Sequence, residues 1–194
     1  MQKISGISGN PANKSYLLCI SLAVFYILAC ERAPDLEKTH SFSKLGIEFK
    51  YPGNWSIMED EITGAGRYIL IRTTGDGITM IQYFRRPQFD TLQDFAGFMT
   101  ELYSQEFQEG AVQDIDYQKI DGTLGPDNVS GLRETHSLNA AGQTLVVVRE
   151  FFRMSAGSRW IYITHHIPRE DYQQVRPGFD LIRSSMKVDE NNLF

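Results

Sequence analysis

The chain contains very little cysteine. Only Cys19 and Cys30 occur among its 194 residues, and both precede the part that we expect to fold. Small exported domains often depend on disulfides, but no cysteine pair is available beyond residue 30. The sequence therefore excludes a disulfide-stapled scaffold, and about 150 residues are enough for one domain to be stabilised by a buried core instead.

The sequence also lacks an apolar run of membrane-spanning length at its N-terminus. The run from Tyr16 to Ala29 has 14 residues, whereas a helix that crosses a bilayer needs roughly 20. Lys3 and Lys14 precede this run, and residues 1–29 contain no acidic side chain. A charged segment followed by a short apolar one is typical of secretory signals, so we interpret residues 1–29 as a signal peptide.

The end of this run, Ile27-Leu28-Ala29-Cys30, resembles the bacterial lipobox. The resemblance implies cleavage between Ala29 and Cys30 and attachment of a diacylglyceryl group, with further acylation such as palmitate, to Cys30. Leu28 departs from the pattern, which usually has a small residue there. The alternatives are an ordinary signal peptide with a chance cysteine and an uncleaved anchor.

Two or more acyl chains would hold the protein stably at a membrane, whereas one chain gives only marginal binding. The lipobox thus predicts a bacterial cell-envelope protein that is anchored through lipid on Cys30. Glu31 is not the aspartate usually associated with retention in the inner membrane, which favours the outer membrane, with the domain facing the periplasm.

Basic side chains are scarce as well. The whole chain has 19 basic and 24 acidic residues, and removal of residues 1–29 leaves 17 against 24. Nucleic-acid-binding domains show a clustered basic footprint, which this balance does not favour. We expect no nucleic-acid partner, and we expect the membrane to be contacted through the lipid rather than through the domain.

Composition divides the rest of the chain into three parts. Residues 30–41 are polar, with one proline and no apolar periodicity, and predict a flexible tether. Residues 42–188 show no repeat and no second linker, which predicts one domain, and residues 189–194 form a tail.

Period-two alternation predicts several strands in this domain. Leu45, Ile47, Phe49 and Tyr51 alternate with small or polar residues until the Pro52-Gly53 pair ends the strand. Runs rich in β-branched and aromatic residues predict further strands at 66–74, 78–85, 111–122, 130–138, 143–154 and 158–167.

Two helical patterns interrupt these strands. Apolar spacing over 91–108 predicts a helix, with Asp90 and Gln93 as its capping box. Pro168 and Pro177 are expected in the first turns of helices, and the last helix carries an apolar stripe of Phe179, Ile182 and Met186. Strands and helices in this order predict an α+β fold with a central antiparallel sheet flanked by helices.

Two stretches resemble the PsbP-like family, which includes a photosystem II extrinsic subunit and many bacterial lipoproteins. They are GIEFKYPGNWSI at 46–57 and RWIYITHHIPREDYQQVRPGFDLIRSSMKV at 159–188. The resemblance implies an αβα sandwich and a binding or assembly role without catalysis. It rests on core and turn residues, so it indicates a fold more than an activity.

Three side chains are candidates for contact with a ligand or partner. Trp55 belongs to an aromatic group with Phe49 and Tyr51 that forms either an exposed patch or part of the core. Arg85 and Arg86 follow a strand and could grip a carboxylate or phosphate, or could pair with surface acids.

The histidines do not indicate a metal site. His165 and His166 are adjacent on a strand and therefore point to opposite faces. His136 could approach one of them, with Glu134 as a third ligand, but zinc sites usually have three or four protein ligands at recognisable spacing. The acidic residues at 58–61 lack an EF-hand pattern. We therefore expect no metal and no cofactor.

No catalytic residue can be assigned from the sequence. It contains no G-x-S-x-G elbow, and TTGDGIT at 73–79 lacks the lysine and spacing of a phosphate loop. The favoured hypothesis is a lipid-anchored, non-enzymatic binding or assembly factor with a protein partner at the envelope. The alternative is an envelope hydrolase whose residues come together only in the folded chain.

Overall fold

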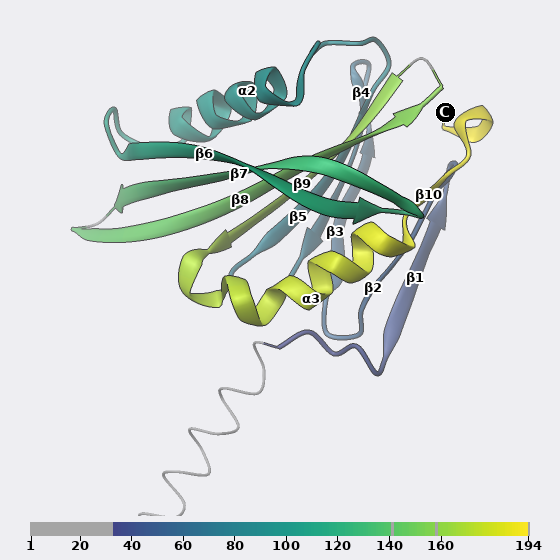
Figure 1. The fold of residues 1–194 in the computed structure, drawn as a ribbon, viewed down its shortest axis with the longest axis horizontal. Helices are drawn as coiled ribbons and strands as arrows, with labels where there is room; N and C mark the ends of the chain where they lie inside the picture. The colour runs from purple at the N-terminus through teal and green to yellow at the C-terminus, as the bar shows by residue number, and fades with distance from the viewer. Residues whose placement is uncertain (1–32, 141, 158, 194) are drawn as a thin grey trace, which may run out of the picture.

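A computed structural model describes residues 33–140, 142–157 and 159–193 (Figure 1). The expected signal peptide and Cys30 lie outside these residues. The described chain has an α+β fold with two sheets and two helices packed on the larger sheet. No helix in these residues combines the length and the apolarity needed to cross a membrane.

The larger sheet has seven strands, all antiparallel to their neighbours, in the order β3-β4-β5-β9-β8-β7-β6. Most of these strands follow the runs of β-branched and aromatic residues, and hairpin turns join β3 to β4, β4 to β5, and β6 through β9. Their bounds are β3 Ser56–Ile62, β4 Gly66–Arg72, β5 Ile78–Phe84, β6 Val112–Leu124, β7 Asp127–Ala140, β8 Gln143–Ala156 and β9 Arg159–Pro168.

The N-terminal strands form a separate sheet with the C-terminal strand. Its order is β1-β2-β10, with β1 at Thr39–Lys44, β2 at Ile47–Pro52 and β10 at Lys187–Val188. The sequence places Leu45 in the first strand, which is wrong. Leu45 and Gly46 form the turn between β1 and β2 with φ of 48° and 70°, because a tight hairpin needs left-handed backbone at these positions.

Helix α2, Leu92–Gln105, begins where the predicted helical spacing begins. Its N-cap is Thr91, whose hydroxyl accepts from Asp94 N, while the Asp94 carboxylate accepts from Thr91 N. The predicted capping box of Asp90 and Gln93 is therefore one residue out of register. Aspartate at the third helical position satisfies the backbone amide of the N-cap residue, as glutamate does in the usual box.

Helix α3, Arg169–Ser185, is a single helix that begins after Pro168 and continues through Pro177. The prediction that Pro177 lies in a first turn is wrong. A mid-helix proline costs about 3 kcal/mol, but the turns on both sides of it bury Val175, Phe179 and Ile182 completely in the core. This burial outweighs the lost backbone hydrogen bond.

The two helices cover opposite faces of the seven-stranded sheet (Figure 1). Phe95 of α2 stacks on Tyr162, whereas Phe179 of α3 stacks on His165. The small sheet lies on the α3 side, where Ile47 and Phe49 of β2 join the main core. We call the other side the α2 face.

The described chain is held to the domain from its first described residue, Ala33, onward. Gly53 N donates to Asp35 O at 3.0 Å, Asp35 N donates to Asn54 Oδ1 at 2.9 Å, and Asn54 Nδ2 donates to Ala33 O at 2.8 Å. Residues 39–41 already belong to β1. The ordered chain therefore begins before residue 42, where the sequence led us to expect the domain to start.

Candidate functional site

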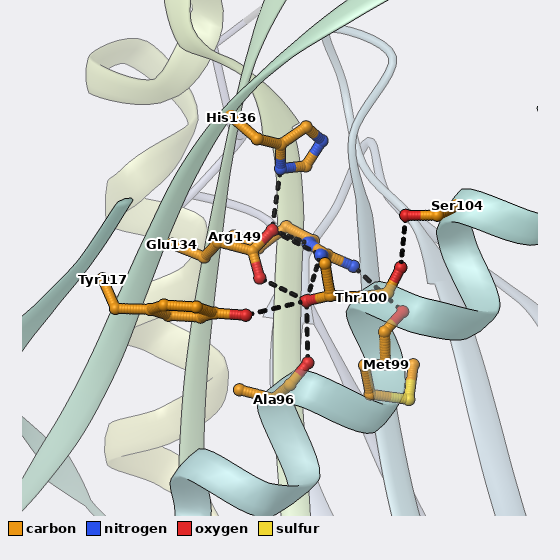
Figure 2. Close-up of polar contacts among 8 residues, drawn as sticks. All are labelled: Ala96, Met99, Thr100, Ser104, Tyr117, Glu134, His136 and Arg149. Atoms are coloured by element: carbon orange, nitrogen blue, oxygen red, sulfur yellow. Dashed lines mark hydrogen bonds and ion pairs between the residues drawn. The ribbon is translucent and has the colours of Figure 1, made fainter. Parts of the chain in front are cut away.

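The α2 face of the sheet carries a buried polar network that holds the helix (Figure 2). Glu134 on β7 and Arg149 on β8 are cross-strand partners, and their side chains form an ion pair. Arg149 Nε donates to Glu134 Oε1 at 3.0 Å, and Arg149 Nη2 donates to Thr100 Oγ1 at 2.7 Å. Arg149 Nη1 also donates to the Met99 carbonyl at 3.2 Å, so one guanidinium joins two strands to α2.

Glu134 is completely buried and is surrounded by donors. His136 Nδ1 donates to Glu134 Oε1 at 2.7 Å, and the Thr100 hydroxyl donates to Oε2. Burial alone raises the pKa of Glu134, but these hydrogen bonds and the charge of Arg149 lower it to about 2. The carboxylate therefore stays ionised and neutralises Arg149 at every physiological pH.

A largely apolar groove of about 420 Å³ lies beside this network, between α2 and the strands that α2 leaves uncovered. We call it the α2 groove. Its floor comes from β5 and β9 and consists of Ile78, Met80, Gln82, Thr164 and His166. Helix α2 lines it with Met99, Leu102 and Tyr103 and with its C-cap residue Glu106, and Tyr68 and Arg149 complete the lining.

Two polar atoms in the floor of the groove have no hydrogen-bond partner in the described part of the chain. They are Thr164 Oγ1 and Gln82 Oε1, and both atoms are buried. Thr164 as a whole is only 5% exposed. Leaving such an atom unsatisfied costs about 1–3 kcal/mol, so the groove carries hydrogen-bonding capacity that a ligand could satisfy.

Tyr103 and His166 contribute two neutral rings to the lining of the groove. The ring of Tyr103 lies 5.0 Å from that of His166 and 5.4 Å from that of His136. Burial and the charge of Arg149 lower the pKa of His166 to about 4, and burial raises the pKa of Tyr103. Both side chains are therefore neutral at pH 7.

The histidines lie as the strand period predicts, on opposite faces of β9. His165 lies on the α3 side and accepts or donates one hydrogen bond with Thr79, at 2.9 Å, whereas His166 lies in the α2 groove. His136 is on the same face as His166, with Tyr103 between them. Among the described residues, no group of three or more His, Cys, Asp or Glu side chains could hold a metal ion.

Glu134 and His136 form an acid–histidine pair of the kind that hydrolases use, but their surroundings do not fit that chemistry. The side chain of His136 has no solvent exposure, and its Nε2 has no partner within the described ranges. A general base must reach the proton that it removes from a nucleophile or substrate. Here the pair serves to fix the carboxylate that holds Arg149.

The predicted contact residues lie in two different settings. Trp55 is 3% exposed, donates to Thr74 Oγ1 at 3.3 Å and packs edge-on against Phe179, so its indole belongs to the core rather than to a surface patch. Arg85 and Arg86 are exposed in the loop after β5. None of these three lines the α2 groove, and Cys30 lies outside the described residues.

Only weak signals for the groove are present in the sequence. Thr164 is a hydroxyl within the apolar strand WIYITHHI, and Arg149 is a charge within VVVREFF. An isolated polar residue in such a run indicates a buried polar contact, but it does not identify the partner. No protein-family model and no curated protein matches this chain.

Proposed function

We propose that this chain is a lipid-anchored, non-catalytic binding protein of the bacterial cell envelope, and that the α2 groove is its binding site. The lipobox-like Ile27-Leu28-Ala29-Cys30 sequence supports the anchor, with acyl groups on Cys30 and the domain facing the periplasm from the outer membrane. A protein partner at the envelope is compatible with this role, and Arg85 and Arg86 are the candidate contacts for it.

The observation that carries the binding role is the groove itself. Ligand sites are usually concave, mainly apolar and about 300–1,000 Å³ in volume, with a few placed polar groups. The α2 groove has about 420 Å³, apolar walls and two unpartnered polar atoms. The Arg149–Glu134 pair supports its wall from behind, which keeps the site preformed.

We also propose that the domain has the αβα arrangement of the PsbP-like family. An αβα arrangement of the PsbP-like type accounts for the resemblance of residues 46–57 and 159–188, which supply β2, β9 and α3. In that family such a domain serves binding or assembly, which agrees with a groove of ligand size. An envelope hydrolase is the alternative, but the acid–histidine pair of Glu134 and His136 is buried and does not line the α2 groove.

Intact-mass analysis of protein extracted from bacterial membranes tests the anchor. We expect a chain that starts at Cys30 and carries a diacylglyceryl-sized addition, and we expect Cys30→Ser to lose that addition. An unmodified chain would show that Cys30 is incidental and that the protein is not held by lipid.

Binding of the uncharged dye Nile red tests the groove. Two half-exposed leucines on the same face of the sheet provide a matched pair, since Leu102 lines the groove and is 43% exposed, while Leu145 lies outside it and is 38% exposed. We expect Leu102→Arg to reduce dye fluorescence several-fold and Leu145→Arg to leave it unchanged. Equal effects of the two changes on dye fluorescence would show that the dye does not bind in the α2 groove.

A further inference from the structure

We propose that the α2 groove binds an uncharged, single-chain amphiphile whose hydroxyl or amide head is hydrogen-bonded by Thr164 and Gln82. This inference rests on the proposed function and adds the chemical class of the ligand. Three properties of the groove support it: the two unpartnered polar atoms, the balance of charge around them, and the side chains that line the remaining surface.

The polar atoms define where the head lies. Gln82 on β5 pairs with Tyr162 on β9, and Met80 pairs with Thr164, so Gln82 and Thr164 are diagonal neighbours on adjacent strands. Such positions are about 7–8 Å apart and within reach of one small group placed between them. Both atoms are shielded from solvent, so a ligand hydroxyl reaches them once the partly exposed Gln82 side chain turns aside. The hydroxyl then donates to Gln82 Oε1 and accepts from Thr164 Oγ1, which satisfies both atoms.

The charges around the groove disfavour an ionic head. The guanidinium of Arg149 is already paired with Glu134 and stacks 5.0 Å from the ring of Tyr103. An anion would have to compete with Glu134 for Arg149 and would also face Glu106 at the rim. A cation would be buried beside Arg149. A neutral head avoids both costs, since burying an unpaired charge is far more expensive than burying a hydrogen-bonded hydroxyl.

The remaining lining suits an alkyl chain. Met80 and Ile78 in the floor face Met99 and Leu102 on α2. Methionine side chains are unbranched and adaptable, and they fill space around flexible apolar ligands. A volume of about 420 Å³ accommodates one chain of moderate length rather than a diacyl lipid.

Three probes with the same alkyl chain separate the head groups: 1-decanol, decanoate and decylammonium. Each is titrated at pH 7.5 by calorimetry into the full chain with Cys30→Ser, which removes the acylation site, and the titration of Leu102→Arg in the same chain subtracts binding outside the groove. We expect 1-decanol to bind at least about tenfold more tightly than either ion, because a buried unpaired charge costs more than one lost hydrogen bond.

Variants in the floor test the hydrogen bonds. Thr164→Val removes the hydroxyl at nearly constant shape and is expected to weaken 1-decanol binding about tenfold, the value of one good hydrogen bond. Thr164→Ser is expected to keep most of the affinity, and Thr39→Val, on the exposed strand β1, to leave it unchanged. Gln82→Met gives a second test, and far-ultraviolet circular dichroism verifies that each variant is folded.

The outcomes separate this inference from the proposed function. Binding of decanoate or decylammonium as tight as that of 1-decanol, or tighter, overturns the inference that the ligand has a neutral head. Full retention of 1-decanol affinity in both Thr164→Val and Gln82→Met overturns it as well. Either result keeps the groove as a binding site. Binding of none of the three probes to the folded protein overturns both.

Discussion

Arg149 shows how one buried residue organises the α2 face. Its guanidinium contacts a carboxylate, a hydroxyl and a backbone carbonyl, and these partners come from β7 and from the middle of α2. Removing one partner of a buried ion pair strands the other charge in a low-dielectric setting. The pair therefore matters less for net stability than for the position of α2, which forms a wall of the groove.

The first prediction concerns Glu134. We expect Glu134→Gln to destabilise the fold by about 3–5 kcal/mol, because the charge of Arg149 is then buried without compensation. Glu101→Gln, an exposed position on the same helix that the network holds, is the matched control and should change stability by less than about 0.5 kcal/mol. Urea denaturation measures both, and similar losses in the two variants would contradict the assignment.

The second prediction concerns acid. The folded pKa of Glu134, about 2, lies below its ordinary value of 4.5, so the stability it contributes is present above pH 4.5 and is lost as the pH falls towards 2. His166 has a folded pKa of about 4 against 6.5, so the unfolded chain gains a proton first and stability falls from pH 6.5 to 4.

Urea midpoints measured from pH 7.5 to pH 2.5 check this expectation. They should decline continuously below pH 6.5, and Glu134→Gln should flatten the part of the curve below pH 4.5. A midpoint that does not change between pH 6.5 and 3 would show that neither group is held as described.

The sequence allowed part of this site to be predicted at the residue scale. Placement of His165 and His166 on opposite faces follows from the strand period and is confirmed. Glu134 was considered only as a metal ligand, because its partner Arg149 depends on the register between β7 and β8. The composition of two strands does not determine that register.

At the scale of the element, α2 and α3 differ in how they are attached to the sheet. Helix α2 is capped by Thr91, leaves Gly97 facing open space, and is held by the polar network. Helix α3 packs closely on apolar side chains, and a Cβ added at Gly178 would lie 2.4 Å from Trp55. The absence of a side chain is therefore required at Gly178 but not at Gly97.

This contrast gives the third prediction. Gly178→Ala should destabilise the protein, by about 1–3 kcal/mol as for overpacked cores, because α3 must move away from Trp55. Gly97→Ala should stabilise it by up to about 1 kcal/mol, since alanine favours a helix and nothing lies within 4 Å of the added carbon. Thermal unfolding of both variants tests the pair, and a stabilising Gly178→Ala would refute the close packing.

Elements were easier to predict than their ends. Apolar periodicity identified α2, but its cap lies one residue later than expected, since Thr91 and Asp94 form the capping box. The helical stripe with Phe179 and Ile182 was identified too, whereas Pro177 misplaced the start of α3. Propensity disfavours proline inside a helix, and only the buried core around it shows why the helix continues.

At the scale of the whole molecule, the hydrogen-bonded N-terminal segment limits how far the domain can lie from a membrane to which Cys30 is anchored. Two residues separate Cys30 from Ala33, whose carbonyl accepts from Asn54 Nδ2 of the domain, and an extended chain spans at most about 3.6 Å per residue step. With lipid on Cys30, the three residue steps to Ala33 keep this end of the domain within about 11 Å of the bilayer.

The fourth prediction is thus a fixed orientation at the membrane. The end of β8 and the start of β9 lie at the far end of the domain from the N-terminal segment (Figure 1), and Ser155 belongs to the end of β8. Environment-sensitive labels on Glu37→Cys, near the anchor, and on Ser155→Cys can be compared in vesicles with spin-labelled headgroups. We expect strong quenching at residue 37 and weak quenching at residue 155. Equal quenching at both sites would mean that the anchored domain tumbles freely.

The global fold class follows from the order of strand and helix patterns, and the α+β, antiparallel assignment is confirmed. The separation of β1, β2 and β10 into a second sheet was not predicted, because pairing between residues near 47 and 188 is set by the tertiary fold. The α2 groove was not predicted for the same reason, since its floor and wall come from elements that meet only in the folded chain.

The most direct test of the account is a methyl spectrum of the protein with ¹³C-labelled methionine during titration with 1-decanol. Met80 and Met99 line the α2 groove, whereas Met154 and Met186 lie on the α3 side of the sheet and serve as internal controls. We predict saturable shifts of the first two methyl signals and none of the last two. Shifts confined to the control methyls, or no shift at all, would contradict the claim that this protein binds its ligand in the α2 groove.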